Sequence, residues 1–297
     1  MEKGQDCGMG DGPSSGATDR DASGAALRLL RREDLADLMR LKESAGWNQT
    51  AQDWERLLEL EPEGCFGMER DGVLVATATA LTYGQDLAWI GMVLTLPEHR
   101  GHGYAGRLME RAMEFAERRG VARVGLDATD MGFELYRRFG FAPVSVVERW
   151  EGPGLDGAVA PAAVAEWAPD PVLDRTAFGT DRSRLLENLA REGAASVPGE
   201  GYAMGRAGSQ AAHFGPCVAR SADAARQLLA WFLARHPEQT SYWDIPADNQ
   251  AAVALAEANG FQRVRQLTRM LRELRPVAPG NAPDHSLVFA IAGFECG

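Results

Sequence analysis

The feature that most constrains this chain is a predicted strand, a glycine-rich loop and a predicted helix that follow one another over residues 91–120. Apolar residues precede Pro97, the loop reads RGHGYA, and apolar residues then recur with helical spacing. Glycines permit a tight turn and close approach to a ligand, and the first amides of a helix lack partners within it. Such a junction is suited to an anion such as a pyrophosphate, although glycines here also fit a plain turn.

The residues around this segment predict a mixed α/β unit with antiparallel strands first and a βαβα unit second. Turns are expected at Asp71-Gly72 and at Gly84-Gln85, and Thr50 is a helix N-cap. The expected helices span 34–43, 51–60, 104–119 and 131–140. A strand is expected at the start of the segment 26–47, a meander of three strands over 65–96, and further strands at 121–128 and 141–150.

The second half repeats the later part of this order. LYRRFGF at 135–141 matches LAEANGF at 255–261, and each follows a predicted strand with an aspartate near its end, Asp127 or Asp244. Two diverged copies of one fold are the simplest explanation. The expected elements are strands at 211–219, 240–246, 261–274 and 286–295, with helices at 221–236 and 249–261.

Stretches rich in Gly, Pro and Ala divide the chain. We expect a flexible tail at 1–24, a first domain at 25–150, a linker at 151–161 and a second domain at 162–297. The stretch at 275–285 separates the final apolar segment from what precedes it.

Composition limits the partners, metals and cellular location that we expect for this protein. The net charge is −11, and the basic residues are scattered, which disfavours nucleic acid and anionic membranes as partners. No apolar run reaches about 18 residues, and the first residues contain no apolar signal segment. The four cysteines lack metal-binding or disulfide-framework spacing, so we expect no metal, reduced thiols and a cytoplasmic location.

Two motifs resemble those of the GNAT superfamily of N-acetyltransferases. The loop RGHGYA fits that family's Arg/Gln-x-x-Gly-x-Gly/Ala pattern, and TDMGFELYRRFGF fits its Leu-Tyr-x-x-x-Gly-Phe segment, although Thr129 and Gly132 stand where Asn and Ala are common. The chain is similar to a bacterial subgroup with two GNAT domains in tandem. The resemblance implies an α/β fold with mixed sheets, in two tandem GNAT-like domains of which the second is degenerate.

The resemblance also implies a reaction. A primary amine would attack the thioester of acetyl-CoA, used as co-substrate, and a backbone N–H near Val93, Leu94 or Thr95 would stabilise the oxyanion. The cofactor-binding residues implied are those three with Arg100, Gly101, His102, Gly103, Tyr104, Ala105 and Thr129.

Tyr136 is the implied acid for the departing thiolate. A buried core aromatic at helical spacing is the alternative explanation of this tyrosine. The general base is unassigned, because Glu98, His99 and Asp127 each also fit a loop or strand-end role.

Trp47, Asn48 and Gln49 are the expected substrate-binding residues, since the corresponding connection walls the acceptor pocket in the family. A tryptophan that fills the core beside a helix cap is an equal alternative. The second copy has no glycine loop and has Ala256 where the first has Tyr136, so we expect no transfer there. It could cover the pocket, with Trp243, Asp244 and Arg269 as contacts, or be purely structural.

The sequence leaves the acceptor open among small amines, amino acids, aminoglycoside-like compounds and protein amines. Two other classes of function compete with transfer to an amine. One is an acyl-CoA binding or sensing protein without catalysis, and the other is an interaction protein that has kept only the fold.

Overall fold

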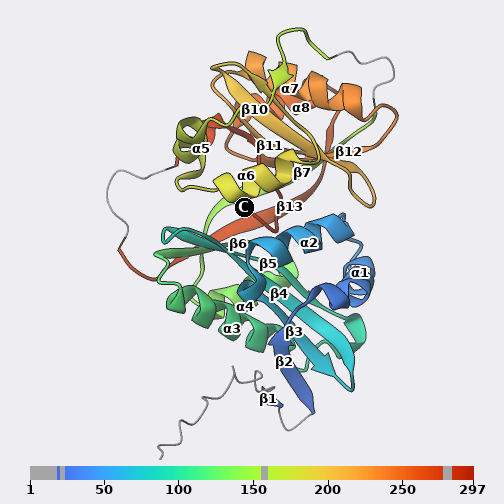
Figure 1. The fold of residues 1–297 in the computed structure, drawn as a ribbon, viewed down its shortest axis with the longest axis vertical. Helices are drawn as coiled ribbons and strands as arrows, with labels where there is room; N and C mark the ends of the chain where they lie inside the picture. Colours follow the sequence, from blue (N-terminus) through green and yellow to red (C-terminus); the bar gives the residue numbers. More distant parts are fainter. Residues whose placement is uncertain (1–18, 21–23, 155–159, 277–282) are drawn as a thin grey trace, which may run out of the picture.

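A single mixed β-sheet runs through both copies of the repeat (Figure 1). The computed structural model describes residues 19–20, 24–154, 160–276 and 283–297. Within these residues the strand order is β1-β2-β3-β4-β5-β6-β13-β7-β12-β11-β10-β9-β8, and β14 pairs with β11 beside this path. The parallel neighbours are β5 with β6 and β11 with β12.

The two copies have the same order of elements. The first contains β2 (Ala25–Leu29), α1 (Leu35–Ser44), α2 (Ala51–Leu60), β3 (Cys65–Arg70), β4 (Val73–Tyr83), β5 (Leu87–Thr95), α3 (Tyr104–Arg118), β6 (Arg123–Ala128), α4 (Asp130–Arg138) and β7 (Ala142–Gly152). The second contains β8 (Ala165–Glu166), α5 (Pro171–Phe178), α6 (Ser183–Ala190), β9 (Ala194–Val197), β10 (Gly201–Arg206), β11 (Ala212–Ala219), α7 (Ala222–Arg235), β12 (Ser241–Pro246), α8 (Gln250–Ala258) and β13 (Gln262–Glu273). β1 (Asp19–Arg20) precedes them and β14 (Val288–Ala290) follows.

Local chemistry explains several boundaries. Thr50 caps α2 through a capping box with Asp53, whose carboxylate accepts from the Thr50 N–H at 2.8 Å. Asp71 and Gly72 both have positive φ, 52° and 78°, which suits a tight hairpin between β3 and β4. Ser221 and Asn249 cap α7 and α8, so the helix starts expected in the second half are confirmed within a few residues.

Other expectations are corrected. The segment expected as a strand at 286–295 forms β14 over only three residues, followed by a chain without regular structure. The expected tail at 1–24 lies outside the described residues apart from Asp19, Arg20 and Gly24, and so does Cys7. The other three cysteines, Cys65, Cys217 and Cys296, are buried and free.

The two copies exchange their last strands. β13, from the second copy, pairs with β6 of the first, and β7, from the first copy, pairs with β12 of the second. β7 and β13 pair with each other, with Val147 opposite Leu267. These two residues occupy equivalent places in the repeat, so an approximate two-fold axis passes between them. The expected domains 25–150 and 162–297 divide the chain but not the sheet, and their boundaries remain a prediction.

A buried ion pair fixes each exchanged strand. Arg269 of β13 lies opposite Asp127 of β6 and donates two hydrogen bonds to it at 2.9 Å. Arg149 of β7 lies opposite Asp244 of β12 and donates two at 2.8 Å. Both aspartate side chains are fully buried, so each depends on its arginine from the other copy.

Further buried charges link the copies at α2. Asp53 accepts hydrogen bonds from Arg56 and from Arg206 of β10, the latter at 3.1 Å. Arg206 also donates to Glu295 at 2.9 Å, and Arg56 pairs with Glu192. The capping carboxylate of a first-copy helix is therefore neutralised partly by the second copy.

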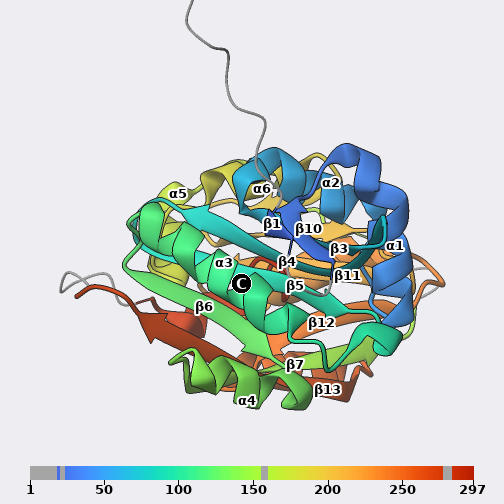
Figure 2. The ribbon, with the colours of Figure 1, turned by 90° about the horizontal axis from the view of Figure 1, so that it is seen from below.

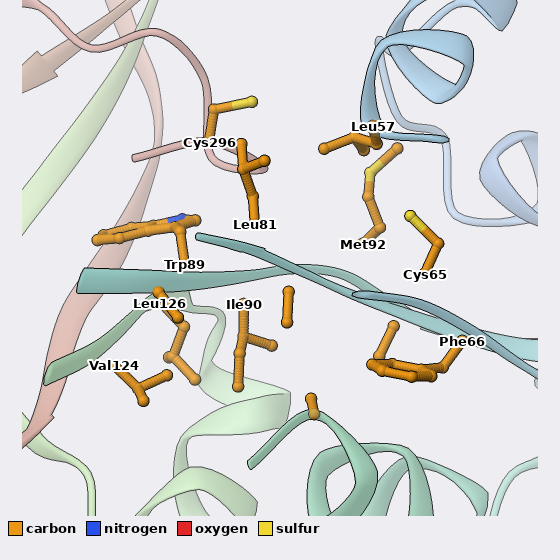
Figure 3. Close-up of a cluster of buried hydrophobic side chains, with 14 of the residues drawn as sticks. Leu57, Cys65, Phe66, Leu81, Trp89, Ile90, Met92, Val124, Leu126 and Cys296 are labelled. Atoms are coloured by element: carbon orange, nitrogen blue, oxygen red, sulfur yellow. The ribbon is translucent and has the colours of Figure 1, made fainter. Parts of the chain in front are cut away.

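The helices cover the sheet on both faces. Figure 2 shows α3 lying across the strands of the first copy, with α4 beside β7 and β13. In Figure 3, Ile90, Val124 and Phe66 lie on one face of the strands, whereas Trp89 and Met92 lie on the other, toward Cys296 and Leu57. The end of the chain thus packs into the core of the first copy. Within the described ranges, no helix combines the length and the apolar character needed to cross a membrane.

We predict that Asp244→Ala destabilises the protein by about 3–5 kcal/mol, because it leaves the Arg149 guanidinium buried without its partner. Differential scanning calorimetry would show this as a clear fall in the unfolding midpoint. The double variant Asp244→Leu/Arg149→Met should recover most of the loss. Asp223→Ala, which removes an exposed ion pair of α7, is the control and should change the midpoint little. A midpoint for Asp244→Ala equal to that of the control would contradict the role given to this pair.

Candidate active site

The glycine-rich loop ends at a helix start that is open to solvent. Gly101 and Gly103 have φ values of 78° and 77°, and Gly103 is the N-cap of α3 with no capping side chain. The first turn carries no acidic residue, and the first helical hydrogen bond runs from the Arg107 N–H to the Gly103 carbonyl at 3.1 Å. The N–H groups of residues 104–106 are therefore available to an anion.

The space beside the loop is empty. A Cβ atom added at Gly101, Gly103 or Gly106 would meet no other atom within 4 Å. Arg100 is exposed and has no acidic partner among the described residues, so its charge adds to the helix end. Open space alone is shared by ordinary turn glycines such as Gly72, so it is the bare helix end beside Arg100 that favours the anion-binding interpretation.

The aromatic residues of the loop stiffen it. The His102 ring stacks on that of Tyr104 at 5.6 Å, and its Nδ1 lies 3.0 Å from the Arg100 carbonyl, where it must be the donor. Tyr104 is buried, and its hydroxyl has no hydrogen-bond partner in the described part of the chain. Ala105 is half-buried in the first turn.

The parallel strands β5 and β6 separate toward their carboxyl ends. They pair only from Leu87–Trp89 to Arg123–Gly125, so the strands are open toward their carboxyl ends. A bulge in β5 widens the opening, because Met92 and Val93 together lie opposite Ala78 of β4. Met92 has φ of 51°, a conformation uncommon for a residue with a side chain.

The bulge directs one backbone amide away from β4. The Met92 carbonyl accepts a hydrogen bond from Thr77 Oγ1 of β4 at 2.8 Å. In a trans peptide the carbonyl and the following N–H point in opposite directions, so the Val93 N–H points away from Thr77. Val93 lines the pocket described next, whereas Leu94 and Thr95 remain paired with β4 and do not line it.

A pocket with a cavity volume of about 100 Å³ lies in this opening and is accessible from solvent. Its walls come from β5, from the end of β6, from the connection between α1 and α2, and from the second half of the chain. The predicted residues that line it are Val93, Thr129, Tyr136, Trp47 and Gln49.

Tyr136 projects into this pocket from α4. Its ring lies against Gly132, where an added Cβ would come within 2.7 Å of the ring, so an alanine there would force the ring to move. Burial raises the pKa of the Tyr136 hydroxyl to about 12. No described residue hydrogen-bonds to this hydroxyl, which leaves it free for a ligand. The tyrosine is buried and also faces the pocket, so the core and site interpretations are compatible.

Thr129 has a structural role as well as a place in the pocket. Its side chain caps α4 by accepting from the Gly132 N–H at 3.3 Å.

Asn48 lies outside this pocket, unlike its neighbours Trp47 and Gln49. Its amide donates to the Ala211 carbonyl at 2.9 Å and accepts from the N–H groups of Gln210 and Ala211. The structure thus uses Asn48 to hold the second copy against the first. Gln49 Nε2 instead donates to Glu295 at 2.9 Å, at the pocket wall.

The second half does contribute to the pocket, but through residues that the sequence did not indicate. Trp243, Asp244 and Arg269 do not line it. Trp243 lies in the second core, and the other two are the partners of Arg149 and Asp127, which do line the pocket. The residues that line it from this half are Arg265, Leu267, Phe294 and Glu295, and Arg149 lines it from the exchanged β7.

One sequence signal for Glu295 existed in β5. Gly91 stands in the middle of a buried strand, where a glycine often marks close approach of another backbone. A Cβ there would lie 2.8 Å from the Glu295 Cα and backbone oxygen. Arg149, Arg265 and Leu267 reach the pocket through strand exchange, for which the sequence carried no signal.

The equivalent opening of the second copy is filled. β11 and β12 pair only from Ala212–Phe214 to Ser241–Trp243, as β5 and β6 do, but β14 pairs with β11 beyond that point. The Ile291 N–H donates to the Asp244 carbonyl at 3.0 Å, and Asn249, the N-cap of α8, donates to two carbonyls of the same segment. The chain's own backbone thus occupies the place of a ligand.

Comparisons with known proteins agree with this architecture. A family model described as the acetyltransferase (GNAT) family matches residues 31–141, and one described as an acetyltransferase (GNAT) domain matches residues 171–282. Together they cover most of the chain.

Two curated proteins are similar over most of their length. Holothin acyltransferase of Pseudoalteromonas sp. (strain SANK 73390) is 25% identical over 84% of this chain and 87% of its own. The uncharacterized N-acetyltransferase YitH of Bacillus subtilis (strain 168) is 26% identical over 75% of this chain and 83% of its own.

Solved structures share the fold. A provisionally assigned acetyltransferase from Pyrococcus horikoshii superimposes with a TM-score of 0.81 at 22% identity, covering 95% of this chain and 99% of that one. A tandem GNAT protein from the clavulanic acid biosynthesis pathway, solved without AcCoA, gives 0.60 at 16% identity over 86% of this chain and 100% of its own. The chain belongs to the GNAT superfamily of acetyltransferases and carries two GNAT domains in tandem.

Proposed function

We propose that the first copy transfers an acetyl group from acetyl-CoA to a primary amine by direct attack. The observation that carries this proposal is that an open helix N-terminus and a pocket lie at the same end of one strand, β5. The bare helix end of α3 follows β5, and Val93 and Tyr136 lie in the opening itself. The names of the relatives support acyl transfer, and that of the clavulanic acid pathway protein mentions AcCoA.

The residues present fit a CoA thioester. The N–H groups at the start of α3 and the exposed Arg100 would hold the pyrophosphate, and the separated strands would admit the extended thiol arm. Acetyl-CoA supplies the activated acyl group, and the protein supplies position and hydrogen bonds.

The amine nitrogen attacks the thioester carbon, and the carbonyl oxygen takes the electron pair of its double bond. The Val93 N–H, pointing away from β4, is placed to donate to that oxygen. Loss of one such donor typically costs about 2.7–4 kcal/mol of transition-state stabilisation. The carbon–sulfur bond then breaks and the sulfur keeps its electrons.

Tyr136 assists the departure of the sulfur. A thiol titrates near about 8.5, so complete proton transfer from a phenol of pKa about 12 would be uphill by roughly 5 kcal/mol in the free groups. Tyr136 therefore acts chiefly as a hydrogen-bond donor whose contact strengthens as charge develops on sulfur. The nitrogen gives up its proton on the acceptor side, where Glu295 has carboxylate lone pairs beyond those taken by Gln49 and Arg206.

The loop can be tested with a matched pair of glycines. Gly103→Ala should weaken binding of CoA at least about tenfold, because the added methyl enters the space beside the helix end. Gly260→Ala is the control, since Gly260 has the same φ of 77° and equally open surroundings but lies after α8. Both variants should lose similar stability from the left-handed backbone, and only the first should lose affinity by isothermal titration calorimetry. Equal affinities for CoA would remove the loop from the binding site.

Tyr136→Phe should lower kcat by about 10²–10³-fold, as for the loss of one donor to developing negative charge, while leaving the affinity for CoA unchanged. Release of free thiol, measured over a panel of primary amines, gives the rate. The wild-type rate should not fall on the alkaline side below about pH 11, because a group that must be protonated loses activity only above its pKa, here about 12. Tight binding of CoA with no turnover on any amine would favour the acyl-CoA sensing function instead.

Asn48 and Gln49 should respond differently to truncation. Asn48→Ala leaves the buried N–H and C=O of Ala211 without partners, so it should lower stability by about 2–4 kcal/mol. Gln49→Ala should alter the Michaelis constant for the amine with a smaller loss of stability. Thermal unfolding and thiol-release kinetics on both variants measure these effects. A larger loss of stability in Gln49→Ala, or a changed Michaelis constant only in Asn48→Ala, would contradict the structural role of Asn48 and the pocket role of Gln49.

A further inference from the structure

One positive charge in the pocket has no counterpart. Arg265 of β13 lines the pocket and is exposed, and no hydrogen bond or ion pair reaches its guanidinium in the described part of the chain. The other arginine of the pocket, Arg149, is held by both oxygens of Asp244. The lining carboxylates Asp127 and Glu295 are likewise matched, by Arg269 and Arg206.

Arg265 also stands where it is unfavourable for the fold. It lies directly opposite Arg149 in the antiparallel pair of β7 and β13. Like charges placed directly opposite one another destabilise a sheet. Loss of hydration and the neighbouring Arg149 lower the pKa of Arg265 by more than the charge of Asp244 raises it.

The repeat shows that the sheet does not require this charge. Across the approximate two-fold axis, the place of Arg265 is taken by Ser145, which lies opposite Arg269. That equivalent place belongs to the copy whose opening is filled by β14. The unmatched arginine therefore occurs only on the side where a ligand can enter.

We propose that Arg265 binds a carboxylate of the acceptor, so that the amine substrate is an amino acid or a molecule that likewise carries amine and carboxylate together. A guanidinium matches the planar carboxylate with two parallel hydrogen bonds. This inference rests on the proposed function, because it takes the pocket to be the acceptor site.

The rest of the pocket suits the remainder of such a molecule. The Trp47 and Phe294 side chains offer apolar surface, and Glu295 lies where an amine approaching Val93 would meet a negative charge. The pyrophosphate of CoA does not compete for Arg265, because the loop residues 100–105 do not line this pocket.

The test uses sets of three amines that differ only at the carboxylate, such as phenylalanine, phenylalanine amide and phenethylamine, with parallel sets built on leucine and methionine. Thiol release at saturating acetyl-CoA should give a kcat/KM at least about tenfold higher for the acid than for the amide in at least one set. Arg265→Gln should abolish this preference by raising KM for the acid with little change in kcat.

Arg263→Gln is the matched control. Arg263 is an exposed arginine of the same strand that pairs with Glu148 and does not line the pocket, so its loss should leave the preference intact. Equal use of acid and amide in every set, or a preference that survives Arg265→Gln, would overturn the proposal.

A binding measurement separates this inference from the proposed function. With CoA present, calorimetry should detect N-acetylphenylalanine, N-acetylleucine or N-acetylmethionine binding at least about tenfold more tightly than the corresponding amide, and Arg265→Gln should remove the difference. If CoA binds but no amine is turned over, the proposed transfer reaction is refuted, whereas the calorimetric comparison of acid with amide still decides the role of Arg265. No preference for the acid in binding, with CoA bound, would refute the carboxylate site.

Discussion

The strand exchange at β7 and β13 is the constraint on which the rest of the structure depends. Each copy completes its sheet only with the last strand of the other, and each exchanged strand is fixed by an arginine that neutralises a fully buried aspartate. Separating the copies would expose sheet edges and leave two buried carboxylates without their arginine partners, which is costly in a low-dielectric interior. The pocket also depends on the strand exchange, because Arg149, Arg265 and Leu267 reach it on exchanged strands.

The duplication has led to different outcomes in the two copies. Both keep the separated parallel strands, but only the first keeps the glycine loop and the empty space. In the second, β14 occupies the opening, and the chain that leaves it continues to Glu295 at the wall of the first pocket. The segment that closes the second opening therefore also supplies part of the wall of the first pocket.

Much of the fold could be predicted from the sequence because it is encoded locally. Thr50, Ser221 and Asn249 mark helix starts, Asp71-Gly72 marks a hairpin, and the match of 135–141 with 255–261 reveals the repeat. The glycine loop and Tyr136 were found for the same reason, since short motifs carry their geometry with them. β9, β10, α5 and α6 were not assigned from the sequence.

The acceptor side could not be predicted in this way, because its residues meet only through pairing between distant segments. Gln49 and Glu295 are hydrogen-bonded across most of the chain, and Arg265 faces the pocket only because β13 inserts beside β6. Asn48 shows the converse limit. Its polar side chain between two pocket residues favoured a place in the pocket. Three hydrogen bonds to backbone groups of residues 210–211 hold it against the other copy instead.

The exchange also determines when the protein can fold during its synthesis. β6 is complete at residue 128, but its partner β13 ends at residue 273, so the ribosome must add the whole second copy before the first sheet is closed. At typical elongation rates of about 5–20 residues per second, the edge of β6 waits on the order of ten seconds or more without its native neighbour. A nascent first copy is therefore an incomplete sheet with an exposed edge, and its protection during translation is as much a requirement of this architecture as the ion pairs that finally close it.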